Sequence, residues 1–140
     1  MGAVVFKGTE YIAQTLYDYI KTTELFDLLV GGLYKYKRPM IAKNSENRSV
    51  MGVVAVVSGT PSSVQTFRCN VNIYVPSLLA GEVYYPDNST LEKVEQTSVK
   101  VLKDKAIGDC LIRYADTPTY FECTETNEWL VNNSLDVLYL

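Results

Sequence analysis

One segment of the 140-residue chain, from Phe67 to Val75, alternates apolar and polar side chains and constrains the fold more than any other. A period of two is typical of a β-strand with one face in a core. The apolar face consists of Phe67, Cys69, Val71, Ile73 and Val75. The polar face consists of Arg68, Asn70, Asn72 and Tyr74. Because the first set must meet other apolar groups, the second must face water, a channel or a partner.

Two helices are predicted, one on each side of this strand in the sequence. The first is expected to begin at Thr9, whose hydroxyl can cap it. The second follows Ser89 and Glu92, which have the spacing of a capping box, and Gly108 is a suitable terminator. Val50–Val57 is nearly all apolar and suits a strand covered on both faces. Further strands are predicted at Leu33–Lys37, Cys110–Tyr114, Thr119–Thr126 and Leu135–Leu140.

The predicted order of elements is therefore α-β-β-β-α-β-β, with room for an extra hairpin strand. Runs of adjacent strands favour an α+β fold in which an antiparallel or mixed β-sheet packs against two α-helices. The length suits a single domain, and no linker divides the chain. We therefore expect residues 1–140 to form one domain.

Histidine is absent, which excludes Ser-His-Asp and Cys-His catalysis in their usual forms and removes the commonest transition-metal ligand. Cys69, Cys110 and Cys123 form no C-x-x-C pair, so buried, reduced thiols in a cytosolic protein are expected. A solvated face is favoured over metal binding or catalysis for the remaining acidic cluster, Glu122, Glu125 and Glu128. The sequence thus predicts a protein that is not an enzyme and has no metal or cofactor.

Charge is divided unevenly along the chain, whose formal net charge is -3. Residues 1–108 carry 12 basic and 10 acidic side chains, whereas residues 109–140 carry 1 basic and 6 acidic. This division suits head-to-tail contact between identical subunits. Neither a signal peptide nor an apolar run long enough to span a bilayer is visible, so no membrane partner is expected.

A basic segment lies around the strand predicted at Leu33–Lys37. Its members are Lys35, Lys37, Arg38, Lys43 and Arg48. Such a cluster can meet a phosphate backbone, but lysines also protect exposed strand edges. The simpler role in solubility and edge protection is favoured unless a ring of subunits concentrates the charge.

An apolar loop follows the alternating strand. Its members are Leu78, Leu79, Val83, Tyr84 and Tyr85. Five such residues are too many for a solvated loop, so they either fold back on the core or meet a partner. Contact with a partner is slightly favoured, since tyrosine is enriched at interfaces.

Four segments of the chain form a recognisable combination. They are Gly32-Leu-Tyr-Lys-Tyr-Lys-Arg-Pro39, Asn70-Val-Asn-Ile-Tyr-Val-Pro76, Pro86-Asp87 before a helix that begins its apolar face at Leu91, and the final alternating strand. Together they resemble the small tail terminator, or tail completion, proteins of long-tailed bacteriophages. The resemblance covers residues 9–140. The chain departs from the family in Val50–Val57, which is followed at Ser58–Ser63 by fewer charges than the family leads us to expect, and in its apolar loop after Pro76.

The resemblance implies two helices against a sheet and a ring of subunits, usually hexameric, that caps the tail tube. The expected partners are further copies of the chain, the tail tube protein and the head-tail connector or adaptor, in a virion assembled in the bacterial cytoplasm. The basic segment would line the ring lumen or face the tube, where DNA passes without sequence specificity. The apolar loop would be a subunit contact.

Two alternatives remain beside this hypothesis. The first is a different virion joining protein, namely a head-completion or adaptor subunit of the phage neck. The second belongs to another class: a small ligand-binding or enzymatic α+β domain that uses carboxylates or tyrosines, and which would require a deep pocket with converging polar groups.

Overall fold

The computed structural model describes residues 8–39, 48–60 and 64–139. Within them the chain forms three helices and nine strands. The helices are α1 (Thr9–Lys21), α2 (Glu24–Leu28) and α3 (Asn88–Leu102). The strands are β1 (Leu33–Lys35), β2 (Met51–Thr60), β3 (Gln65–Pro76), β4 (Leu78–Ala80), β5 (Val83–Tyr85), β6 (Lys105–Ile107), β7 (Cys110–Tyr114), β8 (Thr119–Cys123) and β9 (Glu128–Tyr139).

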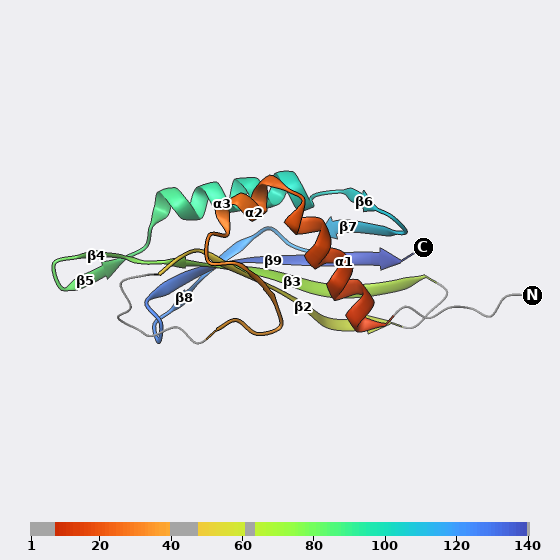
Figure 1. The fold of residues 1–140 in the computed structure, drawn as a ribbon, viewed down its shortest axis with the longest axis horizontal. Helices are drawn as coiled ribbons and strands as arrows, with labels where there is room; N and C mark the ends of the chain where they lie inside the picture. The colour runs from red at the N-terminus through yellow and green to blue at the C-terminus, as the bar shows by residue number, and fades with distance from the viewer. Residues whose placement is uncertain (1–7, 40–47, 61–63, 140) are drawn as a thin grey trace, which may run out of the picture.

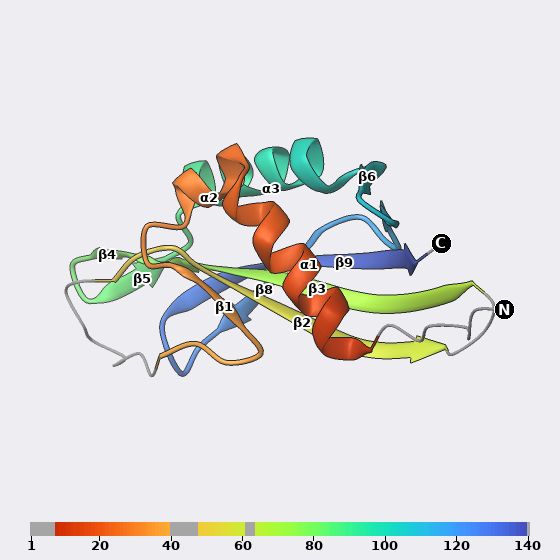
Figure 2. The same cartoon turned by 45° about the vertical axis from the view of Figure 1, so that its right-hand side comes forward.

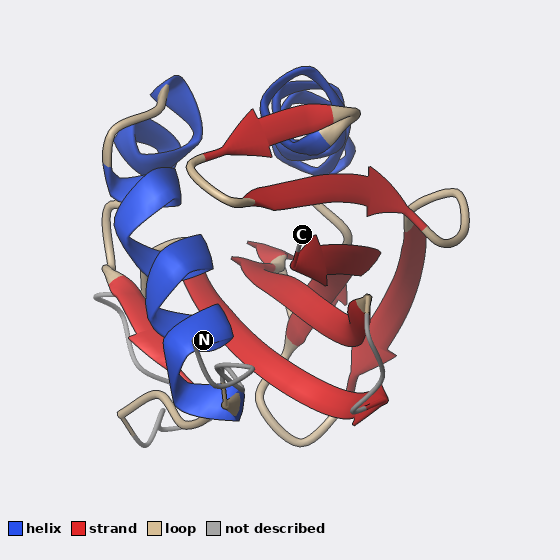
Figure 3. Cartoon of the chain, turned by 90° about the vertical axis from the view of Figure 1, so that its right-hand side faces the viewer, coloured by secondary structure: helices blue, strands red, loops and turns tan. Residues whose placement is uncertain are grey.

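Seven of these strands form one mixed, curled sheet in the order β1-β2-β3-β9-β7-β6, with β8 also paired to β9 (Figures 1 and 3). β1 is parallel to β2, and the other pairs are antiparallel. β3 and β9 pair along their whole length, from Gln65 opposite Tyr139 to Pro76 opposite Glu128. The predicted α+β class is therefore confirmed, with a mixed sheet.

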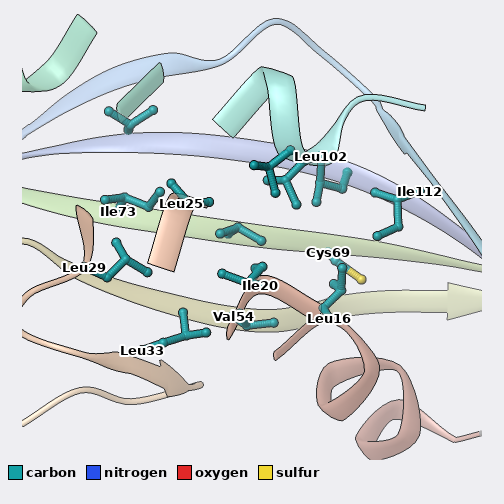
Figure 4. Close-up of a cluster of buried hydrophobic side chains, with 14 of the residues drawn as sticks. Leu16, Ile20, Leu25, Leu29, Leu33, Val54, Cys69, Ile73, Leu102 and Ile112 are labelled. Atoms are coloured by element: carbon teal, nitrogen blue, oxygen red, sulfur yellow. The ribbon is translucent and has the colours of Figure 1, made fainter. Parts of the chain in front are cut away.

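The helices cover one face of the sheet, as Figure 3 shows with α1 and α3 on two adjacent sides of the strands. The predicted apolar face of β3 lies in this core, where none of its five side chains is more than 3% exposed. Ile12, Leu16 and Ile20 of α1 are also fully buried there. Figure 4 shows leucine, isoleucine and valine side chains from helices and strands gathered along the helix-facing side of the sheet, with Cys69 beside Leu16. The period of two in the sequence thus defines the helix-facing side of the sheet.

The predicted order of elements differs from the observed one in three places. Glu24–Leu28 forms a helix of its own, Leu78–Tyr85 forms a separate two-stranded sheet, and Lys105–Ile107 is a strand. Gly108 does not terminate α3, which already ends at Leu102; it lies in the turn between β6 and β7 with a φ of 57°. β2 is buried only in its first half, so the expectation that it is covered on both faces is wrong beyond Val56.

The last strand begins at Glu128, seven residues before its predicted start. The alternating pattern does not reveal the first half of this strand, because Asn133 places an amide on the otherwise apolar face. That amide is fully buried but satisfied: it donates to the Val71 carbonyl over 3.2 Å and accepts from the Tyr114 hydroxyl over 2.9 Å. A polar residue with such partners is tolerated in a core.

The helix caps also differ from the predictions. Asp87 rather than Ser89 caps α3, because its Oδ1 accepts from the Thr90 amide over 3.2 Å. Gly8 occupies the N-cap of α1, and Thr9 lies inside the helix. None of the described helices has both the length and the apolar character that crossing a bilayer requires.

Candidate interaction surfaces

β4 and β5 form a hairpin, here called the arm, which extends away from the body of the molecule (Figures 1 and 2). Leu78 pairs with Tyr85, Leu79 with Tyr84 and Ala80 with Val83. Gly81 supplies the positive φ of 64° that the tight turn requires. The arm continues directly from β3, whose end is held where the Ser77 amide donates to the Asn127 carbonyl over 3.0 Å.

The arm exposes apolar side chains on both of its faces. The exposed fractions are 54% for Leu78, 59% for Leu79, 52% for Val83 and 51% for Tyr85, while Tyr84 is half-buried. Residues directly opposite in a hairpin share a face, so Leu78 and Tyr85 lie on one side and Leu79 and Tyr84 on the other. Of the two predicted outcomes for this loop, folding back on the core does not occur. Contact with a partner stays a prediction.

A groove of about 630 Å³ lies at the base of the arm. Its apolar lining includes Val30, Val50, Leu79 and Tyr84. Val30 is 81% exposed and extends the apolar surface of the arm towards the loop after α2. The volume lies in the range of small-ligand sites, about 300–1,000 Å³. Two of its polar groups, Asp87 and Thr90, already bond to each other as the cap of α3.

The polar face of β3 lies on the side of the sheet opposite the helices and continues onto β9. Asn72 accepts from Asn132 over 2.6 Å, and Arg68 pairs with Asp136 over 2.9 Å. The predicted separation of polar and apolar faces along β3 is therefore confirmed, and the register with β9 extends it to a second strand.

Tyr74, the last member of this polar face, belongs to a buried ionic cluster. Arg38 stacks on it, with the guanidinium carbon 3.7 Å from the ring centroid. The same guanidinium donates two hydrogen bonds to the Glu128 carboxylate, over 2.6 and 2.8 Å, and Arg48 lies 3.4 Å from one carboxylate oxygen. The Glu128 side chain is only 1% exposed. This cluster fixes the segment after β1 across the end of β3 and β9.

Electrostatics explain why a carboxylate is stable at this buried position. Burial alone would raise the pKa of Glu128, but the hydrogen bonds from Arg38 and the positive charges of Arg38 and Arg48 outweigh it and hold the pKa below its usual range. Glu128 was predicted only as part of a solvated acidic face, which is wrong for this residue. The uneven division of charge between residues 1–108 and residues 109–140 was the sequence signal for this ion pair. Arg38 and Arg48 of the first part bind Glu128 of the second part within one molecule.

The basic segment does not form one exposed patch in the described residues. Arg38 and Arg48 are consumed by the Glu128 cluster, and Lys35 pairs with Glu10 of α1. Lys37 is exposed, and Lys43 lies outside the described residues. The fold thus brings Arg38 and Arg48 together, but both guanidinium groups face the Glu128 carboxylate and not an open surface.

The remaining candidate residues are dispersed. Glu122 and Glu125 are exposed beside the turn that joins β8 to β9. Across residues 8–39, 48–60 and 64–139, no three potential ligands gather closely enough to hold a metal ion. Cys69 and Cys110 are buried free thiols, as predicted, and burial raises the pKa of Cys69 to about 12. Cys123 is only half-buried.

Comparison with models of known protein families yields no match, and comparison with curated protein sequences yields no significant match either.

Proposed function

We propose that this protein is a structural subunit of a phage tail or neck, which assembles into a ring that terminates the tail tube and joins it to the head connector. The observation that carries the proposal is the arm, which holds four large apolar side chains at least half exposed outside the core. Patches of this kind mark interaction sites in soluble proteins. The resemblance to tail terminators supplies the biological setting, and the arm supplies the means of assembly.

The other surfaces agree with a role in assembly. The polar side of the sheet offers amides and hydroxyls on neighbouring strands, which suits a wet contact with another protein. In this proposal the exposed side chain of Lys37 faces the lumen of the ring, where it contacts the backbone of the passing DNA without sequence specificity. Arg38 and Arg48 act indirectly by holding the segment that bears them in place.

The direct test measures the mass of the purified chain by size-exclusion chromatography with light scattering, alone and with the tube protein of the same phage. Rings visible in negative-stain images and co-purification with the tube protein are expected. A strictly monomeric chain at high concentration in the presence of the tube protein would contradict the proposal. Co-purification with head connector subunits but not with tube protein would favour the neck adaptor instead.

A second candidate, a small ligand-binding domain, is favoured by one observation, the groove at the base of the arm. It predicts that saturating the groove with an apolar probe such as a naphthalene sulfonate leaves the oligomeric state unchanged. The ring proposal predicts that the bound probe competes with subunit association and lowers the oligomeric state, because the groove is continuous with the arm.

A further inference from the structure

Several strand edges in the described part of the sheet are unpaired. β1, β6 and β8 each pair with one neighbour only, and the half of β2 after Val54 pairs only with β3. An unpaired edge is a template for another strand, and native proteins usually block it with lysine, proline, a bulge or short length.

Three of these edges carry such protection. β1 has three residues, includes Lys35 and is followed by Pro39. β6 also has three residues and begins with Lys105. β2 has a bulge between Val56 and Ser58 in its unpaired half.

β8 differs from the three protected edges. It has five residues, no lysine or proline within the strand, where Pro118 only precedes its first residue, and an unbroken register with β9. Phe121 is 53% and Tyr120 39% exposed, and the strand carries a single charge, that of Glu122. The Tyr120 hydroxyl donates to Glu95 of α3 over 2.6 Å, which fixes the strand against the body. β8 is therefore a preorganised edge that accepts a further strand.

The arm has the matching properties. β4 and β5 each pair on one side only, and each spans three residues, about 10 Å, against about 17 Å for β8. The arm extends beyond the end of β8 and away from it in both Figure 1 and Figure 2, so it does not pair with the β8 edge of its own copy.

The apolar area is adequate for a specific contact. At about 150–200 Å² for each large side chain, the exposed parts of Leu78, Leu79, Val83 and Tyr85 with Tyr120 and Phe121 amount to roughly 500 Å². A standard interface buries about 1,200–2,000 Å², a little over half of it apolar. Arm and edge together supply roughly half to three quarters of that apolar part, and backbone hydrogen bonds supply polar contacts.

We propose that the arm of one copy adds to the β8 edge of a second copy and extends its sheet by β-augmentation. The inference rests on the proposed function and names its subunit contact. Because the arm and the edge are different surfaces, the contact is heterologous, and repetition generates a closed ring or an open filament rather than a two-fold dimer.

Two complementary variants test this contact in the full chain. The arm variant is Leu79→Lys/Val83→Lys, and the edge variant is Phe121→Lys. Val57→Lys is the matched control for added charge. Val57 is 59% exposed, like Leu79, but it lies on the protected edge of β2. Phe121→Ser repeats the edge test without added charge, and circular dichroism establishes that each variant is folded.

Native mass spectrometry over a concentration series gives the decisive readout. The wild type and Val57→Lys should form oligomers larger than dimers, and each of the other variants should lose self-association by about tenfold or more. An equimolar mixture of arm and edge variants should form a 1:1 dimer and nothing larger, because only one intact arm and one intact edge remain. Amide exchange at residues 119–123 should slow in the wild-type oligomer.

Each contrary result overturns the inference in a distinguishable way. Full assembly of Phe121→Lys would show that the arm docks elsewhere, and absence of the mixed dimer would show that the arm and the β8 edge do not meet each other. In both cases a wild-type ring would leave the proposed function standing. A wild-type chain that is monomeric alone but forms rings with tube protein would overturn the arm-edge contact only, whereas a monomer under both conditions would overturn the inference and the proposed function together.

Discussion

The central strand pair and the arm are both paired antiparallel but differ in what stabilises them. β3 and β9 pair over twelve residues each and bury alternate side chains beneath the helices. β4 and β5 pair over three residues each, and the arm keeps four large apolar side chains at least half exposed. A short two-stranded hairpin is marginal by itself in water. The comparison indicates that the centre is stabilised within one molecule, whereas the arm buries little apolar surface of its own, as the proposed contact with a second copy requires.

The largest effect is expected from Leu135→Ala in the central pair. Leu135 is fully buried opposite Cys69, so truncation removes contacts and leaves a cavity. The free energy of unfolding should fall by about 4 kcal/mol. Urea denaturation followed by circular dichroism measures it, with Leu111→Ala in β7, 40% exposed, as the control that should lose less than 1 kcal/mol or so. Similar losses in both variants would contradict the assignment of the core.

A somewhat smaller effect is expected from Glu128→Gln, which leaves two arginines around an uncharged amide. Loss of one partner from a buried ion pair should lower the free energy of unfolding by about 3 kcal/mol. Lys37→Ala is the control, because Lys37 is an exposed neighbour of Arg38. Equal stability of Glu128→Gln and wild type would show that the cluster is not formed in solution.

The same cluster predicts a dependence on pH. The folded pKa of Glu128 is lowered, so its stabilisation is complete above the unfolded value of about 4.3 and is lost as the pH falls through the folded pKa. Chemical denaturation between pH 7 and pH 3 should show the wild type losing more stability than Glu128→Gln. Parallel losses in the two proteins would contradict the lowered pKa.

An intermediate effect is expected from Tyr114→Phe, which removes the hydroxyl that bonds to buried Asn133. An unpaired acceptor should remain on the core side of β9, at a cost of about 1 kcal/mol in the free energy of unfolding. Tyr120→Phe is the control, since its hydroxyl bonds to Glu95 at an exposed site and should contribute less. Thermal denaturation of Tyr114→Phe and Tyr120→Phe measures the difference. Equal stability of the two variants would contradict a stabilising bond between Tyr114 and Asn133.

The smallest effect on folding is expected from Leu79→Lys in the arm. Because Leu79 is 59% exposed, the free energy of unfolding of the monomer should change by no more than about 0.5 kcal/mol. Its self-association should nevertheless weaken in sedimentation velocity. A large loss of monomer stability would show that the arm belongs to the core, and the contrast drawn above would fail.

Local patterns were sufficient for much of the fold. The alternation in Phe67–Val75 predicted the buried face of β3, and Cys110–Tyr114 was predicted with the observed bounds. The start of β9 was missed because Asn133 interrupts its apolar face, and its partners come from Val71 and Tyr114, which are distant in the sequence. A pattern confined to one strand contains no information about such partners.

The candidate surfaces show the same limit. Composition alone indicated that the apolar loop is a contact surface or part of the core, and the structure excluded folding back. The burial of Arg38 against Glu128 could not be predicted, because the two residues are 90 positions apart in the sequence. The selection of β8 as an interaction edge likewise required the full pairing scheme of the sheet.

The sequence by itself determined the α+β class, the two faces of β3 and the exclusion of histidine chemistry, because these follow from composition and from the period of side chains along a single strand. Only the tertiary structure decided which charges neutralise each other within the molecule, which strand edges are protected and that the apolar loop projects as an arm. Those properties depend on distances between residues far apart in the chain, and such distances exist only once the sheet has formed.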